Sequence, residues 1–168
     1  MTTSLVSARW IVTGIEDDGK PLIIPDAALA HDNGRVVAVG PADKIRTKYP
    51  DATETSYGTH MMLPGFVNSH HHVGLTPLQL GSPDYALELW FAGRLSARDI
   101  DPYLDTLYSA FEMIESGITT VQHIHGWMKG PYENVHNAAS AVLSAYKDMG
   151  MRTSYCFAVR EQNHFVYE

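Results

Sequence analysis

The first sixty positions alternate short apolar segments with turn residues, a pattern typical of β-strands. Apolar segments cover residues 7–13, 27–31 and 35–39. The pair Asn33-Gly34 is the preferred sequence of a tight hairpin, so we expect the second and third segments to pair with each other. Residues 42–49 predict a short helix after this hairpin.

Beyond position 60 the apolar segments become longer, and strand-like segments alternate with segments of helical period. An almost continuous apolar run over 61–67 indicates a strand covered on both faces, as in a parallel sheet. Further strands are expected over 118–125 and 151–159, and helices over 101–117 and 132–149. This order of strand and helix is the signature of βαβ units.

The two expected helices carry clear start and stop signals. Asp101 caps the first helix, Pro102 is suited to its first position, and Gly117 stops it. Gly150 ends the second helix. The apolar stripe that we expect to face the core in the first helix is Leu104, Leu107, Tyr108, Phe111 and Ile114. The corresponding stripe of the second helix is Val135, Ala138, Ala139, Val142, Leu143 and Tyr146.

Length and charge narrow the class of protein. A chain of 168 residues allows one core, or one core with a small appendage. Its 19 acidic and 12 basic residues give a net charge of −7 without a basic cluster, which argues against nucleic acid or an anionic membrane as partner. We see no signal peptide and no apolar run of about 20 residues, so the expected location is cytoplasmic. The single cysteine, Cys156, excludes an internal disulfide and is expected to be a buried, inert thiol.

The segment 63–72, Leu-Pro-Gly-Phe-Val-Asn-Ser-His-His-His, carries the candidate chemistry. Side chains two apart on a strand point to the same side, so His70 and His72 converge and His71 faces away. Two neutral imidazoles at about 2.0–2.1 Å are ordinary ligands of a divalent cation. Catalytic metal sites usually need three or more ligands, so the pair predicts part of a metal site. His71 is expected to be a second-shell or surface group.

This segment resembles the metal-dependent amidohydrolase superfamily, in the branch of cytosine deaminases and triazine hydrolases. The carrying pattern is Pro-Gly, a short apolar pair and then His-x-His within 63–72. Two softer similarities agree in order and spacing: the hairpin sequence Asn-Gly-Arg-Val-Val-Ala-Val-Gly over 33–40, and Gly-Ile-Thr-Thr over 117–120. A small residue commonly stands at the position of His71, which departs from the family pattern.

The resemblance implies an α/β fold, with a partial (β/α)8 TIM-type barrel of three strands after the N-terminal part of a small β-sandwich. The sandwich part is expected over 1–62 and the barrel part over 63–168. His70 and His72 correspond to metal ligands of the first barrel strand. Zinc suits imidazole ligands best, and iron, cobalt and manganese stay open. The family's later histidines and its general-base aspartate have no counterpart in these residues, so the catalytic residue is unassigned and expected outside this chain.

Further candidates follow the second and third expected strands. His123 and His125 form a second His-x-His at a strand end, where barrel active sites are built. We expect a substrate-facing or second-shell role for them, with direct metal contact or a solvated loop pair as alternatives. Arg160 could hold a substrate carboxylate or carbonyl, and a loop salt bridge is the alternative. Trp127 could line a pocket or simply pack.

The predicted function is metal-dependent hydrolysis of a small, non-peptide substrate at a C–N bond, of amidohydrolase or deaminase type. Three barrel strands cannot close, and an open strand edge exposes backbone donors and acceptors. We therefore expect either a complementary chain that supplies the remaining strands or a homo-oligomer. A truncated reading and a self-sufficient small protein are further possibilities. The alternative function is a catalytically inactive barrel fragment that acts as an interaction or assembly module.

Overall fold

A computed structural model of the chain describes residues 3–72, 85–96, 100–126 and 131–158. The chain divides into two compact units, Met1–Pro64 and Gly65–Glu168. Both sheets and helices are present, so the predicted α/β class is confirmed. The assignment of the units to a sandwich and to a barrel stays a prediction.

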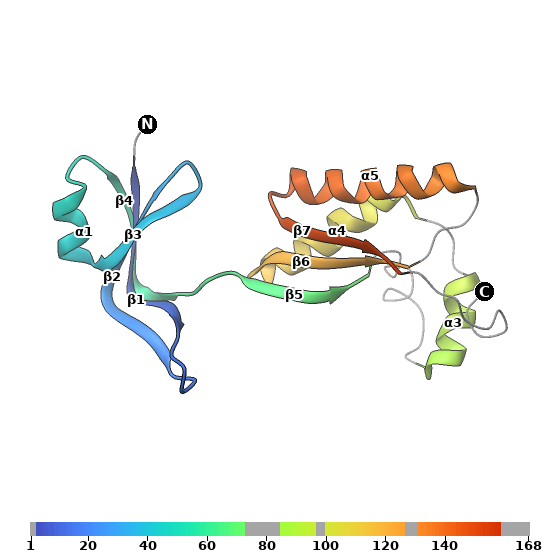
Figure 1. Cartoon of the computed structure of the whole chain (residues 1–168), viewed down its shortest axis with the longest axis horizontal. Coiled ribbons are helices and arrows are strands. Elements are labelled where there is room, and N and C mark those ends of the chain that lie inside the picture. The colour runs from blue at the N-terminus through green and yellow to red at the C-terminus, as the bar shows by residue number, and fades with distance from the viewer. Residues whose placement is uncertain (1–2, 73–84, 97–99, 127–130, 159–168) are drawn as a thin grey trace. The chain divides into compact units, whose positions relative to one another are not determined.

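The N-terminal unit is built on a four-stranded sheet in the order β3-β2-β1-β4 (Figure 1). β1 (Ser4–Ile15) pairs antiparallel with β2 (Pro21–Asp32) and parallel with β4 (Thr53–Met62). β3 (Arg35–Pro41) forms the predicted hairpin with β2. α1 (Ala42–Lys48) is the predicted short helix and packs against β2 and β3.

The hairpin between β2 and β3 has the backbone that its sequence requires. Asn33 and Gly34 have φ values of 49° and 72°, in the left-handed region that Asn and Gly adopt most readily. The turn fixes the register, which brings the small residues of β2 under α1. The core cluster formed in this way contains Leu5, Ala28, Ala30, Ala42 and Ile45.

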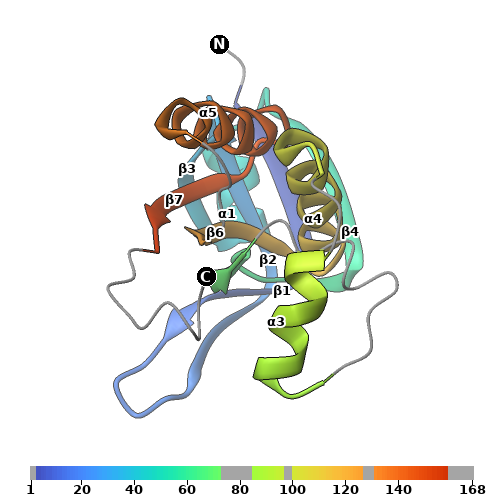
Figure 2. The same cartoon turned by 90° about the vertical axis from the view of Figure 1, so that its right-hand side faces the viewer.

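The C-terminal unit contains a three-stranded parallel sheet in the order β5-β6-β7. Its strands are β5 (Phe66–His71), β6 (Ile118–His125) and β7 (Arg152–Phe157). α4 (Pro102–Glu115) and α5 (Tyr132–Asp148) connect them and lie on one side of the sheet (Figures 1 and 2). The expected βαβ units are therefore confirmed, whereas a partial barrel stays a prediction.

The apolar run over 61–67 is divided between the two units, so its prediction as one covered strand is wrong. Met61 and Met62 end β4, where they pair with residues of β1. Phe66 begins β5, and Val67 in the same strand is 64% exposed. Pro-Gly between the two strands ends the first and lets the second start in another sheet.

The signals at the ends of α4 act as predicted. The Asp101 side chain accepts a hydrogen bond from the Leu104 N–H at 3.0 Å, and Pro102 occupies the first helical turn. Gly117 follows the helix with a φ of 78°, which suits glycine. The additional helix α3 (Leu87–Ser96) was not predicted.

The buried face of α4 is not the predicted apolar stripe. Leu104 is 60% exposed and Phe111 58%, and Tyr108 and Ile114 are exposed as well. The residues that α4 buries are mostly small or polar: Asp105, Thr106, Ser109, Ala110 and Met113. Two of them are satisfied within the helix, because the Thr106 hydroxyl donates to the Pro102 carbonyl and the Ser109 hydroxyl to the Asp105 carbonyl. Such back-bonding makes hydroxyl side chains compatible with a buried helix face.

The predictions for α5 and for the cysteine are partly corrected. Val142 and Tyr146 of α5 are buried as predicted, whereas Leu143 is exposed. Cys156 is also exposed, because it lies on the face of β7 that the helices do not cover. Its sulfur accepts a hydrogen bond from the Gln122 amide at 3.3 Å. Within the described part of the chain, no helix is long and apolar enough to cross a membrane.

Candidate metal centre

The histidine segment lies at the end of β5, where a β-bulge interrupts its pairing with β6. Asn68 pairs with Val121 and His71 pairs with His123, so three steps along β5 match two along β6. A bulge of this kind redirects the side chains that follow it. Here Asn68 and His71 both lie on the side of the helices: Asn68 is 3.7 Å from the Met113 sulfur of α4, and His71 is in register with the fully buried His123.

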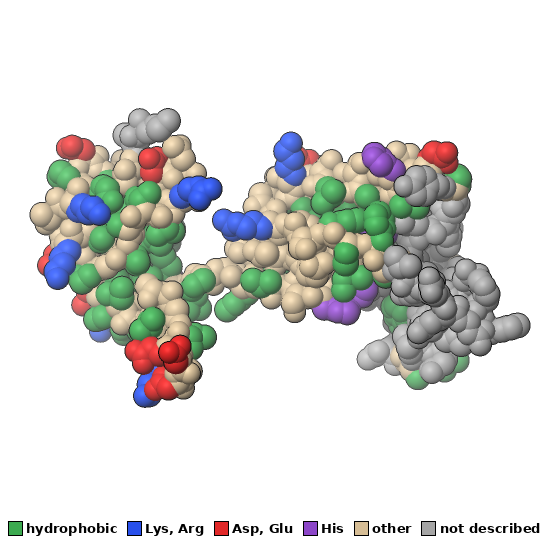
Figure 3. Space-filling model, in the orientation of Figure 1, with side chains coloured by type: hydrophobic (Ala, Val, Ile, Leu, Met, Phe, Trp, Pro, Cys, Tyr) green, Lys and Arg blue, Asp and Glu red, His purple; other side chains and the backbone are tan. Residues whose placement is uncertain are grey.

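His70 and His72 therefore lie on the opposite, open face of the sheet. Figure 3 shows histidine side chains on the surface along β5, on the side away from α5. The Nε2 atoms of His70 and His72 are 3.0 Å apart, and the rings meet edge to face with an angle of 79° between them. The two imidazoles thus direct the same ring atom toward one point. Their role as metal ligands stays a prediction.

A backbone group on the neighbouring strand orients one of the two rings. The Nδ1 atom of His72 is 2.7 Å from the carbonyl oxygen of Ile124. Because a carbonyl oxygen only accepts, His72 carries its proton on Nδ1 and presents a lone pair at Nε2. Histidine ligands of metals commonly use this kind of outer hydrogen bond to fix tautomer and orientation. The Nε2 atom of His70 lies beside this lone pair, 3.0 Å from Nε2 of His72.

The donor geometry fits a divalent cation. Two nitrogens at about 2.0–2.1 Å from a tetrahedral cation lie about 3.3 Å apart, close to the 3.0 Å seen here. Among the described residues, no group of three or more His, Cys, Asp or Glu side chains is placed to hold a metal. The described residues therefore bring together two candidate ligands, fewer than the three or more that catalytic metal sites usually need.

His71 occupies the polar layer between the sheet and the helices. Its ring centroid is 6.0 Å from that of His123. Burial lowers the pKa of His71, and the nearby His72 adds to this effect, whereas Asp105 opposes it. His71 is therefore a neutral imidazole that faces the helices, which agrees with the predicted separation from His70 and His72.

His123 is the most enclosed histidine of the described residues. Its side chain is 0% exposed, and its Nδ1 lies 3.0 Å from the Tyr146 hydroxyl of α5. Its ring stacks on Tyr155 of β7, with the centroids 5.2 Å apart and the planes 6° from parallel. Burial is the main cause that lowers the pKa of His123 to about 3, and neighbouring histidines add to it.

His125 shares the face of His123. It is 7% exposed, and its ring lies 5.5 Å from that of His123 and near the rings of Tyr155 and Phe157. A solvated loop pair therefore does not describe His123 and His125. Both face the helices, on the opposite side of the sheet from His70 and His72, and the predicted roles of His123 and His125 stay predictions.

Three groups near the candidate site were not found by sequence reasoning: the Asn68 amide, the Ile124 carbonyl and the Tyr146 hydroxyl. The first lies inside the motif but two positions before the ligands, and the second is a backbone atom without a sequence signature. Tyr146 was predicted only as an apolar core residue. The candidates Arg160 and Trp127 lie outside the described residues.

The chain is similar in sequence to proteins of known function. Residues 27–52 match the family model of the imidazolonepropionase-like composite domain of bacteria. The chain is 30% identical over 129 residues to the 5-methylthioadenosine/S-adenosylhomocysteine deaminase of Nitratidesulfovibrio vulgaris (strain DP4). This match covers 73% of the chain and 28% of the relative.

Solved structures share the fold over almost the whole chain. A triazine hydrolase from Arthrobacter aurescens has a TM-score of 0.72 and 22% identity, covering 94% of this chain and 36% of that one. An atrazine chlorohydrolase from Arthrobacter aurescens TC1, complexed with zinc, has a TM-score of 0.70 and 22% identity, covering 91% and 35%. The chain thus spans about a third of the length of the proteins that it matches.

Proposed function

Because this chain belongs to the amidohydrolase superfamily, we propose that it provides the first two metal ligands of a hydrolase that acts on a small, non-peptide molecule at a C–N bond. The observation that carries this proposal is the convergence of two imidazoles. The Nε2 atoms of His70 and His72 are 3.0 Å apart, on the open face of the parallel sheet. Barrel enzymes place their catalytic residues at the carboxyl ends of their parallel strands.

The residues of this chain would prepare the site in three ways. The Ile124 carbonyl keeps the proton of His72 on Nδ1, so that Nε2 is free to bind a cation. His70 would hold the same cation through its Nε2, which lies 3.0 Å from that of His72. His71 is kept out of the site on the other face. A bound divalent cation, with zinc the first candidate, supplies an activated water at neutral pH and polarises the scissile group.

The substrate class that we propose is taken from the relatives. The Nitratidesulfovibrio relative is named for the deamination of 5-methylthioadenosine and S-adenosylhomocysteine. Deamination of an adenine nucleoside is therefore the first reaction to test. Amide, carbamate and triazine substrates are the next, since the structural neighbours include a triazine hydrolase.

The proposed active form contains further strands besides the three of this sheet, supplied by a complementary segment. The chain covers about a third of its relatives, and Phe66 and Val67 of β5 are exposed on a sheet of three strands. A complementary segment would cover such apolar side chains, and it would supply the remaining ligands and the general base. A homo-oligomer would cover the edge without supplying a different set of ligands.

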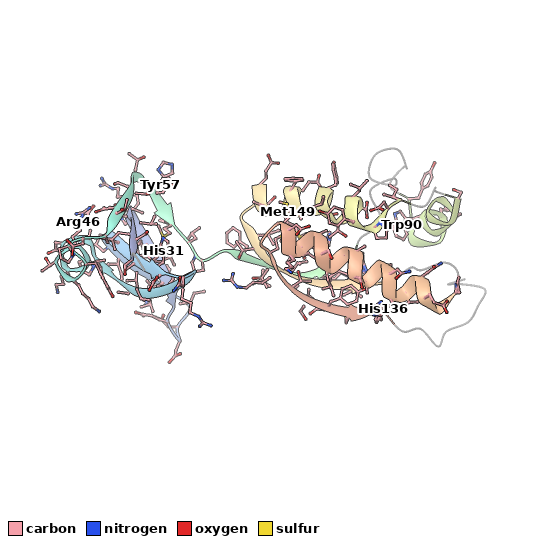
Figure 4. All side chains as sticks on the ribbon, turned by 90° about the horizontal axis from the view of Figure 1, so that it is seen from above. His31, Arg46, Tyr57, Trp90, His136 and Met149 are labelled. Carbon is pink, nitrogen blue, oxygen red and sulfur yellow. The ribbon has the colours of Figure 1, made fainter. Side chains whose placement is uncertain are left out.

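A complementation assay tests the proposed function. The chain is mixed, with Zn²⁺, with the part of the Nitratidesulfovibrio relative that lies outside the matched segment, and ammonia release from 5-methylthioadenosine is measured. We expect release only from the mixture. His70→Ala should abolish it, whereas His136→Ala, which removes an exposed histidine of α5 (Figure 4), should leave it unchanged.

The alternative function is an inactive assembly module, and the same assay separates it from the enzyme. The module is favoured by the small donor set, because only two histidines converge among the described residues. A stable complex without hydrolysis of the adenine nucleoside or of amide and triazine substrates would support the module. Zn²⁺-dependent hydrolysis that His70→Ala removes would support the enzyme.

A further inference from the structure

We propose that Asn68 is a positioning residue that determines which face of the sheet carries the two histidine ligands. This inference rests on the proposed function of His70 and His72 as a metal-binding pair. Asn68 itself contributes no atom to the open face, and it acts through the backbone of the strand. The inference concerns the bulge between β5 and β6 and the side-chain amide that holds it.

The histidine segment alone does not decide its own orientation. Residues 70–72 are three consecutive histidines, so each face of the strand would carry a histidine in either register. A shift by one residue changes only which histidine that is. In the regular alternation of a strand, residues 70 and 72 would share the face of Asn68, and residue 71 would take the other. Asn68 faces the helices, because its amide nitrogen contacts the Met113 sulfur of α4.

The observed arrangement is the reverse of regular alternation. His71, not His70, is in register with His123 on the side of the helices. The bulge inserts one residue between Asn68 and His71, and this turns His70 and His72 to the open face. Without the bulge, the open face would carry the single imidazole of His71, which cannot form a converging pair.

Two contacts of Asn68 hold the bulge in place. Its Oδ1 accepts a hydrogen bond from the His70 backbone N–H at 3.1 Å, within the segment where the register shifts. Its Nδ2 donates to the Met113 sulfur at 3.7 Å and ties the strand to α4. An Asn side chain that bonds to the backbone two residues later is a recurrent means of bending an extended chain. Alanine at this position would remove both contacts.

Three variants separate positioning from general stability. Asn68→Ala removes the acceptor for the His70 N–H, and Asn68→Asp keeps an oxygen in the same place. Asn137→Ala removes an exposed asparagine from α5 and is the control. Two properties are measured for the full chain: the rate of hydrogen–deuterium exchange at the C2 position of each histidine without metal, and the affinity for Zn²⁺ alone. Urea unfolding of each variant is recorded beside them.

In the wild type, Asn68→Asp and Asn137→Ala, we expect the ring of His70 to exchange faster than that of His71. In Asn68→Ala this order should be reversed, and the affinity for Zn²⁺ should fall about 10- to 100-fold. The exchange order depends on which ring is exposed, so a uniform loss of stability would not reverse it.

The proposal is overturned if Asn68→Ala keeps both the exchange order and a Zn²⁺ affinity within about twofold of the wild type. Reversal in Asn68→Asp would overturn the claim that the hydrogen bond from the His70 N–H to Oδ1 holds the bulge, because that variant keeps this acceptor and loses only the contact with Met113. Failure of the proposed function would give a different result. The wild-type chain would show the expected exchange order, but its Zn²⁺ binding would not depend on His70.

Discussion

Two His-x-His pairs end neighbouring strands of one parallel sheet, and the structure treats them in opposite ways. The pair of β5, His70 and His72, lies on the open face, with its Nε2 atoms 3.0 Å apart. The pair of β6, His123 and His125, lies under the helices. Of the two, His123 forms a hydrogen bond with Tyr146 and stacks on Tyr155. The same sequence spacing thus gives a candidate ligand pair in one strand and a buried polar core in the next.

The difference comes from the register between the strands. The β-bulge in β5 turns its outer histidines away from the helices, whereas β6 and β7 pair without interruption from Thr120 to His125. On the open face an imidazole is accessible to a cation. In the buried layer the charged form is penalised, which is why the pKa of His123 falls to about 3. Spacing alone therefore identifies candidates, and the face of the sheet decides their chemistry.

The largest expected effect is on the pH dependence of stability. His123 binds a proton with a pKa of about 6.5 in the unfolded chain and about 3 in the folded one. The unfolded state therefore gains protons first as the pH falls, so stability is complete above about pH 6.5 and is lost toward pH 3. The total loss from this group is up to about 4–5 kcal/mol. The titratable groups packed around the His123–Tyr146 pair are His71, His125, Tyr155, Tyr146 and Asp105.

Urea unfolding between pH 6.5 and pH 5 measures this contribution without interference from Glu54. The pKa of Glu54 is lowered to about 2 by Arg46 and Ser7, so this carboxylate affects stability only below about pH 4.5. His123→Phe keeps a ring on Tyr155 but cannot be protonated, and it should reduce the pH dependence to the part that His71, whose pKa is also lowered by burial, contributes. His70→Ala should retain it. An unchanged slope in His123→Phe would contradict the comparison.

Alanine substitution should distinguish the two pairs in stability. His123→Ala leaves a cavity and an unpartnered Tyr146 hydroxyl, and we expect a loss of about 2–4 kcal/mol in the free energy of unfolding. His70→Ala removes an exposed ring and should change it by less than about 0.5 kcal/mol. Denaturant unfolding at pH 7.5 checks both values. Equal losses for the two variants would remove the distinction between the pairs.

Gly65 provides a way to disturb the contact between the start of β5 and Thr119 of β6. A Cβ at this position would overlap the side chain of Thr119, and φ is not unusual there. Gly65→Ala should cost about 1–3 kcal/mol, because either β5 or Thr119 must shift. Gly58→Ala, where a Cβ would meet nothing within 4 Å, is the control and should be nearly neutral. Thr119→Ala in the Gly65→Ala background should recover part of the loss, and no recovery would show that the overlap is not the cause.

The smallest expected effect on stability comes from the two tyrosines around His123. Tyr146→Phe removes the partner of His123 Nδ1 and should cost about 1 kcal/mol. The hydroxyl of Tyr155 is buried without a hydrogen-bond partner in the described structure, so Tyr155→Phe should be neutral or slightly stabilising. Thermal unfolding of the two variants compares their stabilities. A larger loss for Tyr155→Phe than for Tyr146→Phe would contradict this prediction.

Much of this arrangement could be predicted from the sequence where the signal is local. The Asn33-Gly34 hairpin and the Asp101 cap depend on a few adjacent residues, and both are present. The convergence of His70 and His72 follows from their spacing. The face that they occupy depends on a bulge that only pairing with β6 reveals.

The errors have a common physical origin in tertiary contacts. The apolar stripe of α4 is exposed and a more polar stripe is buried, because hydroxyls that bond within their own helix cost little to bury. The strand β4 was not predicted over most of its length, because it has few apolar residues and is defined by its pairing with β1. Cys156 follows the alternation of β7 to the uncovered face although its neighbours in sequence are apolar. None of these outcomes is contained in a window of a few residues.

The central claim is that the open pair, and not the buried pair, binds the metal. Nitrogen-15 NMR of the histidine rings during titration of the full chain with Zn²⁺ tests it most directly. We predict that the Nε2 signals of His70 and His72 shift together with a single binding curve, while those of His123 and His125 stay in place. Shifts confined to His123 and His125, or a titration that leaves all four rings unchanged, would contradict the claim.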